Sequence, residues 1–126
     1  MAQLRSYTTI SQSKKLAEFL PNYSADMGWY YSQDPNAARV MMWCGTKAEG
    51  ADIPCWSLSA LLAILPVNIE YKGESHRLRL DLGEKDFNIW YDNTDIGGAS
   101  DIDVLADNPI DACYEMIIKL KEQNLL

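Results

Sequence analysis

Apolar and polar residues alternate with a period of two over residues 67–91, which is the pattern of strands with one buried face. Short polar segments divide this region into three strands, so we expect a three-stranded antiparallel meander. The alternate apolar side chains are Val67, Ile69 and Tyr71 in the first strand, Leu78, Leu80 and Leu82 in the second, and Phe87, Ile89 and Tyr91 in the third.

The register of the meander follows if apolar residues lie opposite each other across each turn. Loops of four residues at both turns place Ile69 opposite Leu78 and Leu80 opposite Ile89. The first of these loops begins at Lys72. These two residue pairs are the test of the predicted register.

Two short helices are expected ahead of the meander. Thr9 and Gln12 match a capping box, which predicts a helix over about residues 10–20. Residues 58–65 are apolar except for Ser59, and a helix that is apolar on all sides is typical of a buried, central position.

The C-terminal helix has the strongest local signals. Asn108 is a good N-cap, Pro109 suits the first helical position, and Asp111 places a negative charge in the first turn. An apolar stripe follows, with Glu115 and Lys119 at i, i+4 spacing on the outer face. We expect this helix over about residues 109–123.

Two stretches lack a clear period. Aromatic residues alternate with glycines and prolines over residues 21–56, where we expect two short strands near 28–32 and 39–44. The second stretch, residues 92–107, is polar and contains glycine, and we interpret it as a loop.

Together these elements predict an α+β fold in one domain that spans residues 1–126. The meander's apolar face would be covered by the helices at 58–65 and 109–123. A second hairpin, formed by the strands near 28–32 and 39–44, could extend the meander. The chain has 126 residues, of which 48 % are hydrophobic, so it is long and apolar enough for one packed core.

Charge and composition disfavour several functions. The 18 acidic residues outnumber the 11 basic ones, and a net charge of −7 repels nucleic acids and anionic lipids. The longest apolar run, residues 58–67, is about half of the ~20 residues that a membrane span needs. The N-terminal residues lack the pattern of a secretory signal, and three cysteines form no disulfide framework. We therefore expect a cytoplasmic protein that binds neither nucleic acid directly nor membranes.

One pair of residues is a candidate for catalysis. Cys55 precedes the central helix, whose N-terminus could lower the thiol pKa. The meander would bring His76 back toward this helix end, so a cysteine-dependent hydrolase that uses Cys55 and His76 is the alternative function. The step from Cys55 to Trp56 is similar to that of papain-like proteases, but the glycine and second cysteine of their motif are absent. A buried structural cysteine is the simpler interpretation.

No cofactor or metal is expected. Cys44, Cys55, His76 and Cys113 lack the paired spacing of zinc ligands. Residues 92–98 match a calcium loop in neither glycine register, and the common nucleotide-binding motifs are absent.

A binding site is expected instead near the aromatic segment from Trp29 to Trp43, because aromatic residues and methionine are common in interfaces. A domain core uses the same residues, so that interpretation also stands. If a pocket exists, we place it beside the N-terminus of the central helix. Its predicted lining is Trp29, Trp43, Cys55, Trp56, Tyr71 and His76.

The chain also resembles a group of small uncharacterised proteins from gut Bacteroidetes and their phages or prophages. The resemblance rests on Ala-Asp-Met at 25–27, the block Trp-Ser-Leu-Ser-Ala-Leu-Leu at 56–62, and Pro54 and Pro66 around that block. In that group a small, non-nucleophilic residue usually stands at the position of Cys55. The resemblance implies a bacterial or phage cytoplasm and an accessory role, without a cofactor or catalytic residues. Our prediction is therefore a non-enzymatic protein-binding module.

Overall fold

The computed structural model describes residues 5–30, 39–42, 52–97 and 99–126. It confirms the α+β class: helices accompany two antiparallel sheets, with strand orders β2-β1-β3 and β4-β5-β6-β7. Backbone contacts divide the chain into two compact units, Ser6–Leu61 and Leu62–Leu126, and Arg5 belongs to the second. The single domain stays a prediction, and each unit is described by itself.

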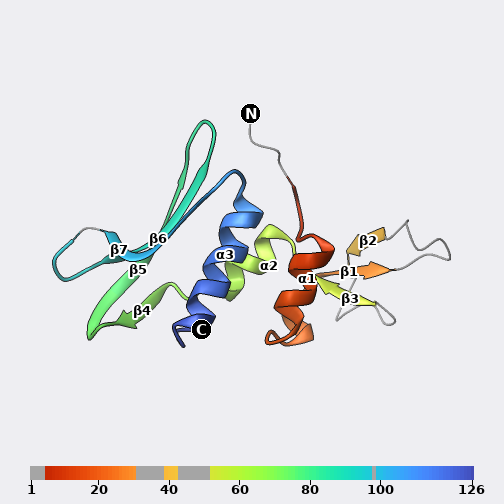
Figure 1. The fold of residues 1–126 in the computed structure, drawn as a ribbon, viewed down its shortest axis with the longest axis horizontal. Helices are drawn as coiled ribbons and strands as arrows, with labels where there is room; N and C mark the ends of the chain where they lie inside the picture. Colours follow the sequence, from red (N-terminus) through yellow and green to blue (C-terminus); the bar gives the residue numbers. More distant parts are fainter. Residues whose placement is uncertain (1–4, 31–38, 43–51, 98) are drawn as a thin grey trace. The chain divides into compact units, whose positions relative to one another are not determined.

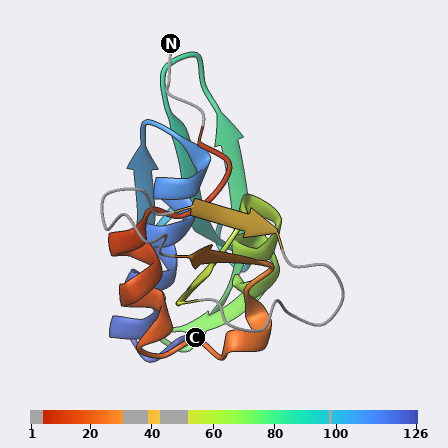
Figure 2. The same ribbon diagram turned by 90° about the vertical axis from the view of Figure 1, so that its right-hand side faces the viewer.

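The first unit combines one helix with the three-stranded sheet. Figure 2 faces this unit and shows α1 beside the strands. Its elements are α1 (Ile10–Ala17), a short 3-10 helix (Asn22–Ser24), β1 (Met27–Tyr30), β2 (Arg39–Met42), β3 (Ile53–Cys55) and the start of α2 (Leu58–Ile64).

The capping box at the start of α1 is confirmed. The Thr9 side chain accepts a hydrogen bond from the Gln12 N–H, and the Gln12 side chain accepts one from the Thr9 N–H. The helix ends at Ala17, before the predicted Leu20. Because Pro21 disfavours a helical conformation in the residue before it, the chain leaves the helix through a turn.

The predicted hairpin of the first unit exists. β1 pairs antiparallel with β2, and Trp29 lies opposite Val40; the predicted turn at 34–36 lies outside the described residues. The hairpin does not extend the meander, because β3 joins it to form a separate sheet. β3 was not predicted, since three residues with a central Pro54 show no period of their own.

The second unit is a four-stranded meander with one long helix (Figure 1). The helix α3 packs against β6 and β7. The elements are β4 (Asn68–Tyr71), β5 (Glu74–Leu82), β6 (Phe87–Asn93), β7 (Ala99–Ala106) and α3 (Pro109–Glu122).

The predicted register of the first turn of the meander is wrong. Ile69 lies opposite His76 rather than Leu78, because the loop has two residues instead of four. Lys72 and Gly73 have φ angles of 54° and 78°, and two positive φ angles are typical of the tight type I′ hairpin turn. The pairing is shifted by two residues, so each side chain keeps the face that the alternation predicted.

The register of the second turn is as predicted. Leu80 lies opposite Ile89, and Leu82 lies opposite Phe87. The tip of this hairpin extends beyond the N-terminal end of α3 (Figures 1 and 2). Ile89 is fully buried, whereas Leu82 is 72 % exposed, so the apolar face is buried near the helix and open toward the tip.

The interpretation of residues 92–107 as a loop is wrong for its second half, which forms β7. Ile102 and Val104 are buried while Asp101 and Asp103 are exposed, so the strand has a period of two. The first two residues of the stretch, Asp92 and Asn93, belong to β6, and the described residues 94–97 form the loop. There the side-chain oxygen of Asn93 accepts hydrogen bonds from the two following N–H groups, at Asp95 and Ile96.

The C-terminal helix is confirmed with its cap. The Asn108 side chain accepts a hydrogen bond of 2.9 Å from the Asp111 N–H, and Arg5 forms an ion pair with the Asp111 carboxylate. The prediction for α2 holds in part: it spans Leu58–Ile64, but Ser59 and Ala63 are exposed, so the helix is not buried on all sides.

Candidate functional site

Thr8 connects most of the predicted site residues of the first unit. Its N–H donates to the Trp56 carbonyl at 3.0 Å, and its hydroxyl accepts from the Trp56 N–H at 3.2 Å. The Trp29 indole donates to the Thr8 carbonyl at 3.3 Å, and the Ser13 hydroxyl lies 2.7 Å from the Thr8 hydroxyl. Thr8 and Ser13 are fully buried, so this polar network is part of the core.

Cys55 is fully buried in β3 beside this network. Its Sγ lies 3.5 Å from the Thr8 carbonyl and 3.6 Å from the Thr8 hydroxyl. Burial raises the pKa of the thiol, hydrogen bonds from Thr8 and Ser13 lower it, and the charge of Asp26 raises it; the net shift is upward. A raised pKa disfavours the thiolate that a nucleophile requires.

The start of α2 is already occupied by protein groups. The Asp26 carboxylate accepts hydrogen bonds from the Ser57 N–H and the Ser57 hydroxyl, and that hydroxyl accepts one from the Ala60 N–H at 3.2 Å. The expectation that the helix N-terminus would lower the pKa of Cys55 is therefore wrong. The Asp26 carboxylate binds the Ser57 N–H and hydroxyl at the start of the helix, and its negative charge raises the pKa of the thiol.

The tryptophans differ in exposure. Trp56 is fully buried, and its indole donates to the Ser24 hydroxyl at 3.0 Å, so its ring belongs to the core of the unit. Trp29 is half-buried and meets Tyr7 edge to face, with ring centroids 5.7 Å apart. Trp43 lies outside the described residues.

Tyr71 and His76 lie together in the second unit. Their ring centroids are 5.7 Å apart, and His76 is 3 % exposed with Nδ1 3.0 Å from the Glu74 carbonyl. The predicted pocket thus draws its residues from both units, with Cys55 in the first and His76 in the second. The joint pocket and the pairing of these two residues stay predictions.

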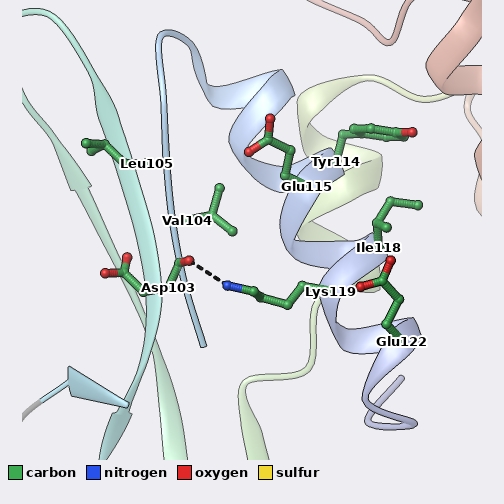
Figure 3. A pocket seen from close by; sticks show the side chains of 8 residues that line it. All are labelled: Asp103, Val104, Leu105, Tyr114, Glu115, Ile118, Lys119 and Glu122. Carbon is green, nitrogen blue, oxygen red and sulfur yellow. Dashed lines mark hydrogen bonds between the residues drawn. The ribbon is translucent and has the colours of Figure 1, made fainter. Parts of the chain in front are cut away.

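A groove that the sequence did not predict lies in the second unit, between β7 and α3 (Figure 3). Its volume is about 370 Å³. Val104 points from the strand toward the helix in this view, and the helix contributes a row of side chains along the other wall. The lining residues are Asp103, Val104, Leu105, Tyr114, Glu115, Ile118, Lys119 and Glu122.

The groove is apolar inside and mainly acidic at its rim. Lys119, its basic lining residue, donates from Nζ to the Asp103 backbone carbonyl at 3.0 Å (Figure 3). Burial and the neighbouring charge of Asp111 raise the pKa of Glu115, and Lys119 partly counteracts them. The spacing of Glu115 and Lys119 was visible in the sequence, but their position beside a strand edge required β7.

The described part of the chain shows neither a metal centre nor a membrane-spanning helix. Within it, no group of three or more histidine, cysteine, aspartate or glutamate residues is placed to hold a metal ion. Its helices are all too short or too polar to cross a bilayer.

Comparison with known proteins gave no relative: no family model, no curated protein and no solved structure matches the chain. The candidate site therefore depends on the geometry of this chain's own residues.

Proposed function

We propose that the protein is a non-enzymatic protein-binding module, an accessory protein of a bacterial or phage cytoplasm. The observation that carries this proposal is the groove between β7 and α3, whose walls combine aliphatic and aromatic side chains with a charged rim. Such a lining suits a protein segment, since interfaces combine an apolar centre with a polar rim. The lining includes no cysteine, histidine or serine that could act as a nucleophile.

The burial of the described cysteine and histidine side chains supports a binding function rather than catalysis. Cys55 and Cys113 are both fully buried, and burial raises the pKa of each thiol. His76 is nearly as buried and rests against a backbone carbonyl and the Tyr71 ring. None of these groups lies in the groove.

Affinity capture from a Bacteroidetes lysate tests the proposal. Ile118 lines the groove from α3 and is half-buried, so Ile118→Asp should abolish retention of a captured protein. The matched control is Leu82→Asp, which changes an exposed leucine of the same unit away from the groove. Circular dichroism confirms that both variants are folded. The proposal fails if the wild-type chain retains no protein, or if Ile118→Asp retains it as well as the control does.

The alternative hydrolase is tested by the rate of iodoacetamide labelling of Cys55 at different pH values. The protein-binding proposal expects labelling below the rate of an ordinary thiol, which titrates near pH 8.5. Rapid labelling of folded Cys55 at pH 6, lost in a His76→Ala variant, would instead establish an activated cysteine and support the hydrolase.

A further inference from the structure

Within the part of the chain that the structure describes, the strand at one edge of the meander has a neighbour on only one side. β7 is the last strand of the order β4-β5-β6-β7, and it pairs with β6. The Asp103 carbonyl accepts from the Lys119 side chain, so this carbonyl points away from β6. Outward carbonyl and N–H groups of an edge strand can pair with a further strand.

The groove lies along this same edge (Figure 3). Successive side chains of a strand point to opposite faces, so a strand added to β7 would direct every second side chain into the groove beside Val104 and Ile118. The volume of about 370 Å³ is within the range of sites that bury small ligands or side chains. Edge and groove can therefore hold one extended segment together.

The charges at the rim of the groove favour a basic segment. Glu115 and Glu122 supply two carboxylates on the α3 side of the groove, against the single ammonium group of Lys119. The Asp103 side chain points away from α3, on the other face of the strand (Figure 3). Lys119 is engaged with the Asp103 carbonyl, and the raised pKa of Glu115 reflects burial and a like charge nearby. A cation placed at this rim would relieve that repulsion.

We infer that the groove takes an extended basic segment of a partner protein, which adds to the edge of β7 as a strand. This inference rests on the proposed function and names the partner's chemistry. Added strands gain affinity from main-chain hydrogen bonds and specificity from pockets for alternate side chains. Lysine or arginine would meet the carboxylates, and aliphatic residues would enter the groove.

A second copy of this chain fits the edge poorly. Pairing β7 with β7 would bring the exposed Asp101 and Asp103 of two copies close together, and like charges across strands are destabilising. Each copy also carries a net charge of −7. The occupant is therefore a segment of opposite charge.

Lys119 protects the edge while the groove is empty. Its ammonium covers an outward carbonyl of β7, as charged side chains do on edge strands that avoid unspecific pairing. An added strand must displace this contact. Removing the lysine should therefore strengthen the binding of a basic strand.

The test uses synthetic peptides and the full chain, with fluorescence anisotropy as the measurement. The first peptide has eight residues that alternate valine and lysine; the second has glutamate for lysine; the third has proline at two central valine positions, which removes N–H groups. We expect measurable binding of the first peptide, weakened by salt, and little binding of the other two. Amide shifts in the NMR spectrum should be confined to β7 and α3.

Variants of the groove separate local recognition from general charge attraction. The double variant Glu115→Gln with Glu122→Gln should lower the affinity for the first peptide about five-fold, which is the effect expected from the loss of two exposed ion pairs. The matched control, Glu84→Gln with Asp95→Asn, makes the same charge change at exposed positions away from the groove and should leave the affinity unchanged. Lys119→Ala should raise the affinity.

The inference is overturned if the glutamate or proline peptide binds as well as the first, if both double variants behave alike, or if peptide addition produces a dimer of the chain. These failures are distinct from failure of the proposed function. If Ile118→Asp loses capture but the first peptide does not bind, the protein is still a binding module, and its partner is of a different kind.

Discussion

The two described cysteines lie in cores of different character. Cys113 is fully buried on α3, and burial by itself raises its thiol pKa to about 12. Cys55 is as fully buried, but hydrogen bonds from Thr8 and Ser13 oppose the effect of burial on its pKa. Equal burial therefore produces different chemistry, because one thiol has polar neighbours and the other has none that lower its pKa.

The surroundings of the two thiols differ in the same way. The first unit connects its elements through a buried threonine that bonds to α1 and to the residue after β3. The second unit packs an apolar stripe of α3 against β6 and β7. The first unit should thus be sensitive to the loss of single hydrogen bonds, and the second to changes of apolar volume and to alkaline pH. The buried residues of α3 are Ile110, Ala112, Cys113, Met116, Ile117 and Leu120.

The largest expected effect tests whether the two units unfold together. Trp56→Ala removes the largest fully buried side chain among the described residues and should lower the free energy of unfolding by about 3–5 kcal/mol. Hydrogen exchange measures the protection of α3 amides in the same variant. If the chain is one domain, these amides lose protection by a similar free energy. Unchanged protection in α3 would contradict the single-domain prediction.

Alkaline pH should destabilise the protein through Cys113. The unfolded thiol loses its proton near pH 8.5, while the folded thiol keeps it to about pH 12. Because the folded pKa is raised, the stabilisation is complete below pH 8.5 and is lost as pH rises toward 12, at up to about 1.4 kcal/mol per pH unit. Urea unfolding between pH 7 and 10.5 measures this loss. Cys113→Ala should make the dependence less steep and leave the part that comes from the raised pKa of Cys55; an identical slope in the variant would contradict the assignment.

Thr8→Val should destabilise the first unit by about 1–3 kcal/mol. The substitution keeps the side-chain shape but leaves the Trp56 N–H and the Ser13 hydroxyl without their partner in a buried site. Thr8→Ser is the control, since it restores the hydroxyl with a smaller loss of packing. Chemical denaturation compares the two variants. Equal stability of the valine variant and the wild type would show that the network contributes little.

The smallest effect concerns the helix caps of the two units. Asn108→Ala removes the acceptor for the Asp111 N–H and should cost about 1 kcal/mol, whereas Asn108→Ser should nearly preserve stability. Ser57→Ala should cost a similar amount, because each side chain accepts from a helix N–H and donates to a carboxylate, which is Asp26 for Ser57 and Asp111 for Asn108. Thermal unfolding compares the three variants. A clearly larger loss for one alanine variant than for the other would contradict this equivalence.

Elements with local signals were predicted well. Asn108 and Pro109 marked the start of α3, and Thr9 marked the start of α1, because a cap is made by residues within one turn of each other. The alternation over residues 67–91 also assigned each side chain to the correct face of the meander. β7 carried a similar alternation at Ile102 and Val104, which the polar loop before it concealed.

The candidate site was much less accessible to prediction. Cys55 looked like a residue at a helix entrance, but pairing with β1 makes it part of a strand, where burial raises its pKa against hydrogen bonds from Thr8 and Ser13. The groove requires an edge strand beside α3, and no single segment shows which strand of a sheet will be last. Sequence reasoning therefore named Cys55 and His76, which are buried, and missed the groove at the surface.

The sequence by itself determined the α+β class, the helix starts and the inward faces of β4, β5 and β6, because these depend on residues a few positions apart. Tertiary structure decided the separate sheet with β3, the burial of the thiols and the groove at β7. The register between β4 and β5 also depended on tertiary structure, because it is set by the two-residue turn at Lys72 and Gly73 that the paired strands form. These features arise from contacts between distant segments, where packing and desolvation outweigh local preference.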